Sequence, residues 1–402
     1  MDYTFLGYER ENGSYGIRNY VLVIPLQKDL NMLADIITKQ VKGARSFIYQ
    51  GENGRPKVDR ELIYRVMVGL GCNPNTCSVL LIAKNEHTGY EELKLNKIME
   101  GISKSQKRIE VLYVEKEGGF YAALGTGVRM LKEMAIDASK CRRTKVGLDK
   151  LNLSVKCGFS DTTSGISGNP VVGDVFDKIG ENGGRMYFSE TTEIIGAEQI
   201  LAKRCKNDKV AQKLINAVKE TEEKALSIGE DIRKVNPIPQ NIEGGISTLE
   251  EKSLGAIAKA GTSVIQDVLQ YGEQPTGQGL YFMDAWMSVY SLPVGYAAAG
   301  SQLMIFQLGG QGLTGQFAPM PAWNPGIVTP IMFVTGNHNA YERTKDGVDF
   351  DSSDVYTKNA KISSVGDKLL GKVIDVCSGT KTSVEIMNYN DPIELDFSGP
   401  NF

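Results

Sequence analysis

Residues 156 to 170 read KCGFSDTTSGISGNP, which gathers small polar side chains and glycines directly behind an apolar run. Lys156 and Asp161 could act in proton transfer or metal binding, because amines and carboxylates are common in both roles. Short hydroxyl and amide side chains suit a polyhydroxylated or anionic substrate, and the candidates here are Ser160, Thr163, Ser164 and Asn169. The alternative is a tight loop whose hydroxyls bond to their own backbone. The density of polar groups favours a binding site.

A second polar stretch, SETTE, follows the strand-like run GRMYF. It contains Glu190 and Glu193, two carboxylates three residues apart. Such a pair suits a hard divalent metal ion, or an acid beside an ionised base. The alternative is that both side chains cap the N-terminus of a following helix. The residues themselves leave both interpretations open.

Two later stretches supply further candidates. In NPIPQNIEGGISTLEEKS, Asn241 lies in a proline and glycine loop and Lys252 lies in a helical segment. A buried Lys252 could serve as a base or hold a substrate carboxylate, although solvated helix charges are more common. VTGNHNAYER follows another apolar run, and we expect Asn337 to bind substrate and His338 to bind metal. A structural, hydrogen-bonded histidine is an equally good interpretation of His338.

These polar stretches follow short apolar runs, so strands of a sheet must position them. From residue 18 to about residue 140, runs such as NYVLVIP, CSVLLIA and RIEVLYVE alternate with amphipathic helical segments. This alternation is typical of a parallel sheet with helices on both faces, which binds ligands beyond the carboxyl ends of its strands. We predict an α/β protein with an N-terminal doubly wound, Rossmann-like parallel-sheet domain (residues 1–143) and a larger C-terminal catalytic α/β domain (residues 144–402). CRRTKVGLDK, residues 141–150, is the candidate linker.

The composition excludes several classes of protein. The 45 lysines and arginines and 48 aspartates and glutamates leave a net charge of −3 without a basic cluster, so no nucleic acid partner is expected. The first residues do not resemble a signal peptide, and no apolar run approaches the roughly 18 residues of a membrane helix. Six cysteines without a CxxC pair indicate reduced thiols. We expect a soluble, cytoplasmic protein with no membrane partner.

Several stretches together resemble one family. KCGFSDTTSGISGNPVVGD is similar to the pattern CGGSD-x-x-SG-x-x-x-NP-x-VG, and GRMYFSETTE is similar to a strand that ends in SE-x-x-E. NPIPQNIEGGISTLEEKSLGAIAKAG resembles NPSPGN-x-x-GG followed by EK-x-x-G-x-x-x-K-x-G. GYERENGSYGIRNYVLV and TGNHNAYERTKDGVDFD resemble two further segments. These are patterns of the altronate and galactarate dehydratases, a family that includes the large subunit of sulfolactate sulfo-lyase.

The resemblance implies a lyase that removes water, or sulfite, from the β-carbon of a hydroxy acid and leaves a 2-keto acid. It also implies a divalent metal such as iron(II) or manganese(II), because proton removal beside a carboxylate needs positive charge at the developing enediolate. Lys156 or Lys252 would be the base or hold the substrate carboxylate, while Asp161, Glu190 and Glu193 would bind the metal or donate the proton. The side chains that orient the substrate would be Ser164, Asn169 and Asn241.

The chain also departs from the family patterns. Relatives commonly start with a small SAF-type domain, which would precede the first residue here, so we expect a separate small subunit besides the small hydroxy-acid substrate; a homo-oligomer stays open. Two family segments with histidine and cysteine, TH-x-x-GC and GCE, read YQGEN and AKNEH here, and Asn73 replaces the histidine of HPN. The family's FTTGRG reads FQLGGQG at Phe306 to Gly312.

Two alternatives to a hydro-lyase stay open, the first from the resemblance to the sulfolactate enzyme and the second from these departures. One is a carbon–sulfur lyase that releases sulfite. The other is a binding or regulatory homologue that kept the cleft and lost the chemistry.

Overall fold

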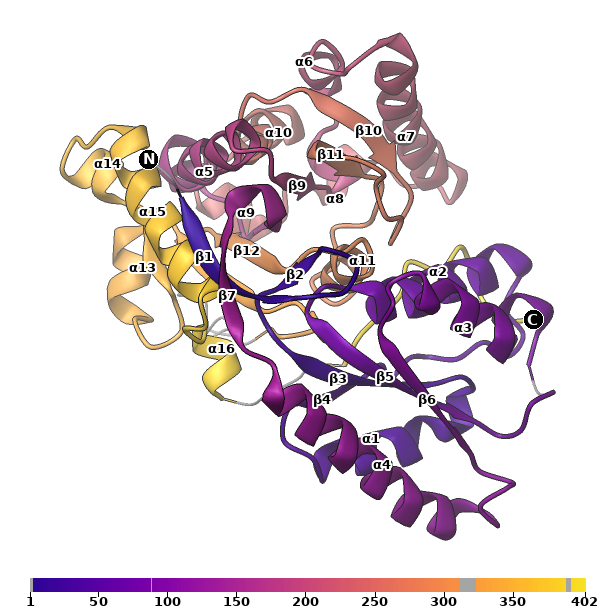
Figure 1. Ribbon diagram of the computed structural model, residues 1–402. Helices are drawn as coiled ribbons and strands as arrows, with labels where there is room; N and C mark the ends of the chain where they lie inside the picture. Colours follow the sequence, from indigo (N-terminus) through magenta and orange to yellow (C-terminus); the bar gives the residue numbers. More distant parts are fainter. Residues whose placement is uncertain (1–2, 88, 311–322, 388–391) are drawn as a thin grey trace.

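The computed structural model describes residues 3–87, 89–310, 323–387 and 392–402, which form an α/β fold with two parallel sheets (Figure 1). The predicted fold class is therefore confirmed. Residues Gln311 and Gly312 of the FQLGGQG segment lie outside the described residues. Among the residues that are described, no helix is both long enough and apolar enough to cross a membrane.

The first sheet is parallel and has the strand order β4-β3-β5-β6. Its strands are β3 (Tyr20–Pro25), β4 (Ala44–Ser46), β5 (Thr76–Ala83) and β6 (Arg108–Tyr113). One face is covered by α1 (Asn31–Lys39) and α4 (Phe120–Lys140), the other by α2 (Lys57–Cys72) and α3 (Leu95–Ser103). Since successive strand residues point to opposite faces, Val21 and Val23 pack with α1 and α4 while Leu22 and Ile24 pack with α2 and α3. The predicted doubly wound arrangement is confirmed.

The second sheet is also parallel, in the order β10-β11-β9-β8-β12-β13-β14. Its strands are β8 (Asn152–Gly158), β9 (Arg185–Phe188), β10 (Ile265–Leu269), β11 (Gly279–Met283), β12 (Leu303–Leu308), β13 (Ile331–Thr335) and β14 (Phe350–Asp351). One face packs against α5 (Asn169–Glu181) and α15 (Ile362–Cys377), and the other against α11 (Leu292–Ala298). On one side of β8 lie β9, β11 and β10, and on its other side lie β12, β13 and β14. The neighbours β8 and β12 thus mark the point where a ligand site is expected.

Further helices and helical turns connect the strands and the helices that cover them. The other helices whose bounds lie within the described residues are α6 (Glu198–Ala202), α7 (Asp208–Ser227), α8 (Ile232–Val235), α9 (Pro239–Glu243), α10 (Leu249–Ile257), α13 (His338–Arg343), α14 (Asp354–Thr357) and α16 (Ser383–Ile386). Single helical turns are η1 (Lys28–Leu30), η2 (Glu91–Leu93), η3 (Leu148–Lys150), η4 (Ser164–Gly168), η5 (Thr191–Glu193) and η6 (Ala258–Ala260).

A small antiparallel sheet joins the segment before the first parallel sheet to the segment after it. In it β1 (Thr4–Glu9) pairs with both β2 (Tyr15–Gly16) and β7 (Arg143–Gly147). The segment expected as a linker, residues 141–150, therefore contains a paired strand. The proposed boundary at residues 143 and 144 stays a prediction.

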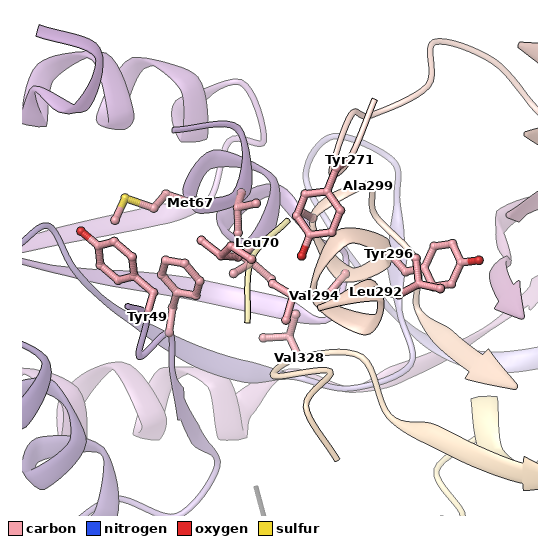
Figure 2. Packing of buried hydrophobic residues seen from close by; sticks show 14 of the residues in the cluster. Tyr49, Met67, Leu70, Tyr271, Leu292, Val294, Tyr296, Ala299 and Val328 are labelled. Atoms are coloured by element: carbon pink, nitrogen blue, oxygen red, sulfur yellow. The ribbon is translucent and has the colours of Figure 1, made fainter. Parts of the chain in front are cut away.

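A continuous cluster of buried side chains joins the two parallel sheets (Figure 2). Met67 and Leu70 of α2 belong to the same cluster as Leu292 and Val294 of α11. The two helices approach closely at Gly69, where a Cβ atom would lie 2.3 Å from the carbonyl oxygen of Ala298. Only glycine fits such an approach.

Asn73, at the end of α2, strengthens this contact between the sheets. Its fully buried side chain donates hydrogen bonds to the carbonyl oxygens of Ala297 (2.7 Å) and Ser301 (2.8 Å). Asn73 therefore caps the end of α11.

Arg18 and Glu385 form a buried ion pair that ties the start of β3 to α16. Arg18 Nη2 lies 2.6 Å from Glu385 Oε2, and both side chains are 3% exposed. Burial alone would raise the pKa of Glu385, but the hydrogen bonds and the charge of Arg18 lower it to about 2. The pair therefore contributes to stability as long as Glu385 is ionised.

We expect Glu385→Gln to lower the free energy of unfolding by about 3–5 kcal/mol near pH 7, because it leaves the Arg18 charge buried without its partner. The folded pKa lies below the ordinary value of 4.5, so the contribution of the pair is present above pH 4.5 and is lost as the pH falls through about 2. Urea denaturation at pH 7 and near pH 3 measures this. Asp35→Asn, which breaks an exposed pair with Lys39, is the control. An equal loss at both pH values would contradict the prediction.

Candidate active site

Lys156 and Cys157, at the carboxyl end of β8, meet Glu190, which follows β9. Lys156 Nζ lies 2.5 Å from Glu190 Oε1 and donates to the carbonyl oxygen of Met287 at 2.8 Å. The backbone N–H of Cys157 donates to Glu190 Oε2 at 3.1 Å. Because neighbouring strand residues point to opposite faces, Lys156 and Cys157 reach this carboxylate from two sides.

Two lysines from the segment after β9 complete the arrangement around Glu193. Lys252 Nζ, on α10, lies 3.1 Å from Glu193 Oε1 and 2.9 Å from Asn236 Oδ1. Lys259 Nζ, in η6, lies 2.6 Å from Glu190 Oε2, 3.6 Å from Glu193 Oε2 and 2.8 Å from Cys157 Sγ. We call the six residues Lys156, Cys157, Glu190, Glu193, Lys252 and Lys259 the lysine–glutamate cluster. All six are at most 4% exposed.

Glu190 adopts an unusual backbone conformation within this cluster. Its φ of 78° and ψ of 74° lie in the left-handed region, which costs a residue other than glycine about 1–3 kcal/mol. It makes no side-chain cap hydrogen bond to η5, so its carboxylate is directed to the lysines rather than to helix amides. Strain of this kind persists where surrounding contacts fix the residue, and it is frequent at functional sites.

The surrounding charges set the protonation of the cluster. Burial alone would raise the pKa of Glu193, but the ammonium groups of Lys252, Lys259 and Lys156 hold it well below its usual range. Burial alone would lower the pKa of Lys259, but Cys157 and the two glutamates hold it well above its usual range. Burial, together with the charges of Glu193 and Glu190, raises the pKa of the Cys157 thiol. We therefore describe an ionised Glu193, a charged Lys259 and a protonated thiol.

Cys157, Glu190 and Glu193 offer ligand atoms within 4.8 Å of one another, so by spacing alone this group could hold a metal ion. A sulfur and carboxylate donor set suits a borderline ion such as iron(II). Yet all four carboxylate oxygens lie within 4.0 Å of a lysine nitrogen. With three ammonium groups in these positions, the arrangement does not fit an additional divalent cation.

A pocket of about 310 Å³ lies at the ends of β8, β12 and β13. Its lining includes Asp161, Thr163 and Asn337, together with Arg343 at the end of α13. Arg343 is exposed, and among the described residues no ion pair or hydrogen bond of its guanidinium is found. The structure thus brings three of the predicted site residues together in one pocket, beside a cation that could meet an anionic group.

Asp161 connects the loops that form this pocket. Its Oδ2 accepts from the backbone N–H of Gly310 (2.7 Å) and from Asn337 Nδ2 (3.0 Å). Its Oδ1 accepts from Thr163 Oγ1 (2.6 Å) and from the backbone N–H of Ser164 (3.0 Å). Both oxygens are therefore engaged in holding the strand-end loops of β8, β12 and β13 in place.

The other predicted substrate-binding residues surround these loops. Asn241 Nδ2 donates to the carbonyl oxygen of Ser160 at 2.8 Å, and Asn169 Nδ2 donates to that of Gly255 at 3.0 Å. In the described part of the chain, several nearby buried polar atoms have no hydrogen-bond partner: Ser160 Oγ, Asn169 Oδ1, Thr192 Oγ1, Ser253 Oγ and Gln307 Oε1. Buried polar atoms need partners, which a substrate or ordered water supplies.

His338 is not brought to Glu190 and Glu193. Its Nδ1 lies 3.2 Å from Asp351 Oδ2, and its side chain is 46% exposed. It does not belong to the group of ligand atoms that could hold a metal. The role of His338 as a metal ligand stays a prediction without support from this geometry.

Sequence reasoning had not included Cys157, Lys259 or Arg343 among the site residues. Lys259 follows Lys252 by seven residues, which is two helical turns, so a shared helix face was a usable signal. Cys157 is adjacent to Lys156, and strand alternation argues against two neighbours entering one site. Arg343 carried no signal in the sequence.

Models of one protein family cover both parts of the chain. Residues 7–139 match "D-galactarate dehydratase/Altronate hydrolase, second domain", and residues 148–396 match "D-galactarate/Altronate dehydratase, C-terminal". Together the two matches span most of the chain and define a protein of the sugar-acid dehydratase class. The chain belongs to the D-galactarate/altronate dehydratase family.

Curated relatives agree with this assignment. The (2R)-sulfolactate sulfo-lyase subunit beta of Chromohalobacter salexigens is 32% identical over 395 residues, which cover 96% of each chain. Altronate dehydratase of Bacillus subtilis is 29% identical over 96% of this chain and 76% of its own length. Galactarate dehydratase (L-threo-forming) of Escherichia coli is 26% identical over 94% of this chain and 73% of its own length.

We expect Cys157 to resist alkylation in the folded protein, because its thiol is buried and its pKa is raised. Native protein treated with iodoacetamide at pH 8 and mapped by mass spectrometry should carry label on the exposed Cys141 but not on Cys157. In urea, all six cysteines should react. Rapid labelling of Cys157 in the native protein would contradict the assigned protonation and burial.

Proposed function

We propose that this protein is a lyase that eliminates water from a sugar acid or related hydroxy acid and yields a 2-keto acid. The observation that carries the proposal is the lysine–glutamate cluster at the carboxyl ends of β8 and β9, in a member of a dehydratase family. Lysine and glutamate are rarely buried unless they are paired, and clusters of buried ionisable groups are frequent at active sites.

The reaction makes chemical demands that the cluster meets. A base removes the proton from the carbon beside the carboxylate, the hydroxyl on the next carbon leaves as water after protonation, and the resulting enol becomes the 2-keto acid. The intermediate carries additional negative charge on the substrate carboxylate. Ammonium groups in a buried site stabilise that charge far better than they would in water.

Residue roles follow from these positions. Lys156 or Lys252 holds the substrate carboxylate as an ammonium group, or acts as the base after it has passed its proton to its partner, Glu190 or Glu193. That glutamate then gives the proton to the leaving hydroxyl, and the neutral lysine takes the proton from carbon, so both side chains return to their starting charges. Asp161, expected as an acid from the sequence, acts here by positioning the pocket loops. No step above uses the iron(II) or manganese(II) that the resemblance implies.

The pocket beside Asp161 is proposed to bind the chain of the substrate. Two segments lead from the cluster to this pocket: residues 157–163, and residues 236–244, which begin at Asn236 beside Lys252. They bond to each other where the N–H of Thr162 donates to the carbonyl oxygen of Gly244 at 3.0 Å. Thr163 and Asn337 then meet substrate hydroxyls, and Arg343 meets a carboxylate or sulfonate.

A carbon–sulfur lyase is the second candidate. It is favoured by the 32% identity with a sulfo-lyase subunit beta that covers 96% of both chains. The name of that relative marks it as one subunit of an enzyme, which supports the proposal that this chain works with a separate small SAF-type subunit.

The test is a panel of aldonates, aldarates and sulfonated hydroxy acids, incubated with the purified chain with and without a small SAF-type partner. Release of 2-keto acid without sulfite supports the hydro-lyase, and release with sulfite supports the carbon–sulfur lyase. Lys156→Met should lose turnover while circular dichroism shows a folded protein. Ligand binding without product across the panel would favour the binding homologue instead.

We expect Arg343→Gln to raise KM about 10- to 100-fold for any substrate found, since one charge-assisted hydrogen bond contributes about 1.5–3 kcal/mol. kcat should change little, because Arg343 lies outside the lysine–glutamate cluster. Lys345→Gln, on the same surface and paired with Glu342, is the matched control. Steady-state kinetics measures both, and an unchanged KM for Arg343→Gln would remove the arginine from substrate binding.

A further inference from the structure

We propose that Lys156, Lys252 and Lys259 supply the positive charge of this site in place of a divalent metal. The catalytic part of this proposal rests on the proposed function. The Cys157, Glu190 and Glu193 group accordingly binds no metal ion in the native protein. The lysine nitrogens stand where a metal would have to bind.

The positions of the lysine nitrogens are the first argument against a bound metal. Lys156 Nζ lies 2.5 Å from Glu190 Oε1, and Lys259 Nζ lies 2.6 Å from Glu190 Oε2. Lys252 Nζ lies 3.1 Å from Glu193 Oε1. The thiol is engaged as well, since Cys157 Sγ lies 2.8 Å from Lys259 Nζ and 2.8 Å from Glu193 Oε2. A metal bound at roughly 2.0–2.3 Å from these ligands would have to displace the ammonium groups.

Charge balance is the second argument against a bound metal. Three lysines and two glutamates leave the cluster with one formal positive charge when the thiol is neutral, and with none when it is a thiolate. A divalent cation would add two more positive charges to side chains that are at most 4% exposed. Uncompensated charge in a buried site is strongly unfavourable.

The rest of the described chain offers no second group of this kind. Among residues 3–87, 89–310, 323–387 and 392–402, Cys157, Glu190 and Glu193 form the single group of three such ligands close enough for one ion. The residues outside these ranges contain no cysteine or histidine.

The contacts of the lysines suit the role assigned to them. Lys259 bridges Glu190 and Glu193, while Lys156 and Lys252 each bind one of them. The three ammonium groups are thereby held in fixed positions before substrate arrives. Preorganised cations of this kind stabilise an enediolate without the rearrangement that water requires.

Cobalt(II) tests the binding directly, because a thiolate bound to cobalt gives a charge-transfer absorption band. Reduced full-length protein is titrated with CoCl₂ alone, and bound metal is counted after equilibrium dialysis. We expect the wild type and Cys157→Ser to give the same spectrum, with no cobalt bound at Cys157. About one Co²⁺ per wild-type chain, with a thiolate band that Cys157→Ser abolishes, would overturn the proposal.

Removal of one ammonium group supplies the converse result. In Lys259→Met the two carboxylates and the thiol lose a shared partner, so we expect about one Co²⁺ per chain and a thiolate band. The double variant Lys259→Met/Cys157→Ser should lose that band. Lys213→Met, the same change at an exposed lysine paired with Asp267, is the control and should bind no cobalt. If Lys259→Met does not fold, the comparison of wild type with Cys157→Ser decides alone.

Turnover of a substrate from the panel tests the catalytic role. After dialysis against a chelator, with metal content measured by mass spectrometry, kcat/KM should change by less than about twofold. Loss of turnover on chelation and recovery with iron(II) or manganese(II) would overturn the catalytic role of the lysines. If no substrate turns over, the proposed function fails, while the cobalt titration still decides whether the lysines exclude a metal.

Discussion

Five charged side chains are buried together at the ends of β8 and β9, and the structure around them is what makes that burial tolerable. An isolated buried charge costs several kcal/mol, whereas a charge with an opposite partner at hydrogen-bond distance costs far less. In the lysine–glutamate cluster each carboxylate oxygen has a lysine nitrogen within 4.0 Å. The cluster can therefore persist only while every element that supplies one of its members keeps its position.

Three separate parts of the second sheet region keep those positions. The parallel pairing of β8 with β9 places Lys156 and Cys157 beside the residue that follows β9. The left-handed backbone of Glu190 then lets one carboxylate meet both Lys156 and Lys259. α10 and η6 supply the two remaining lysines, and α10 is capped by Thr248, whose side chain accepts from the N–H of Glu251. Backbone strain, strand pairing and helix capping all help to position the lysine–glutamate cluster.

The pocket and the cluster have different physical characters, which matches different tasks. The cluster is buried and its carboxylates are paired with lysines, so it stabilises charge. The pocket is open, and it is lined by hydroxyl and amide groups and by the exposed Arg343, so it suits recognition of a polar substrate. Asp161 belongs to the pocket, because its carboxylate holds in place the loops that line it. A family likeness alone would not have separated these two functions.

The sequence by itself determined the local features of this protein. Buried runs such as YVLVIP and the amphipathic helices between them predict parallel strands and their covering helices, since side-chain periodicity is a local property. Polar residues directly behind strands marked Lys156, Glu190 and Glu193 as candidates, a loop and helix segment marked Lys252, and family patterns covered most of the chain.

Only the tertiary structure decided which of these residues meet. Lys259 contacts Cys157 across 102 positions of sequence, and that contact depends on the order of strands and on how η6 packs beneath them. Arg343 reaches the pocket because β13 lies beside β12, while His338, five residues earlier, turns to Asp351. Residue types limit the chemistry that is available, but the crossover connections of a parallel sheet decide which charges are neighbours, and no local pattern carries that information.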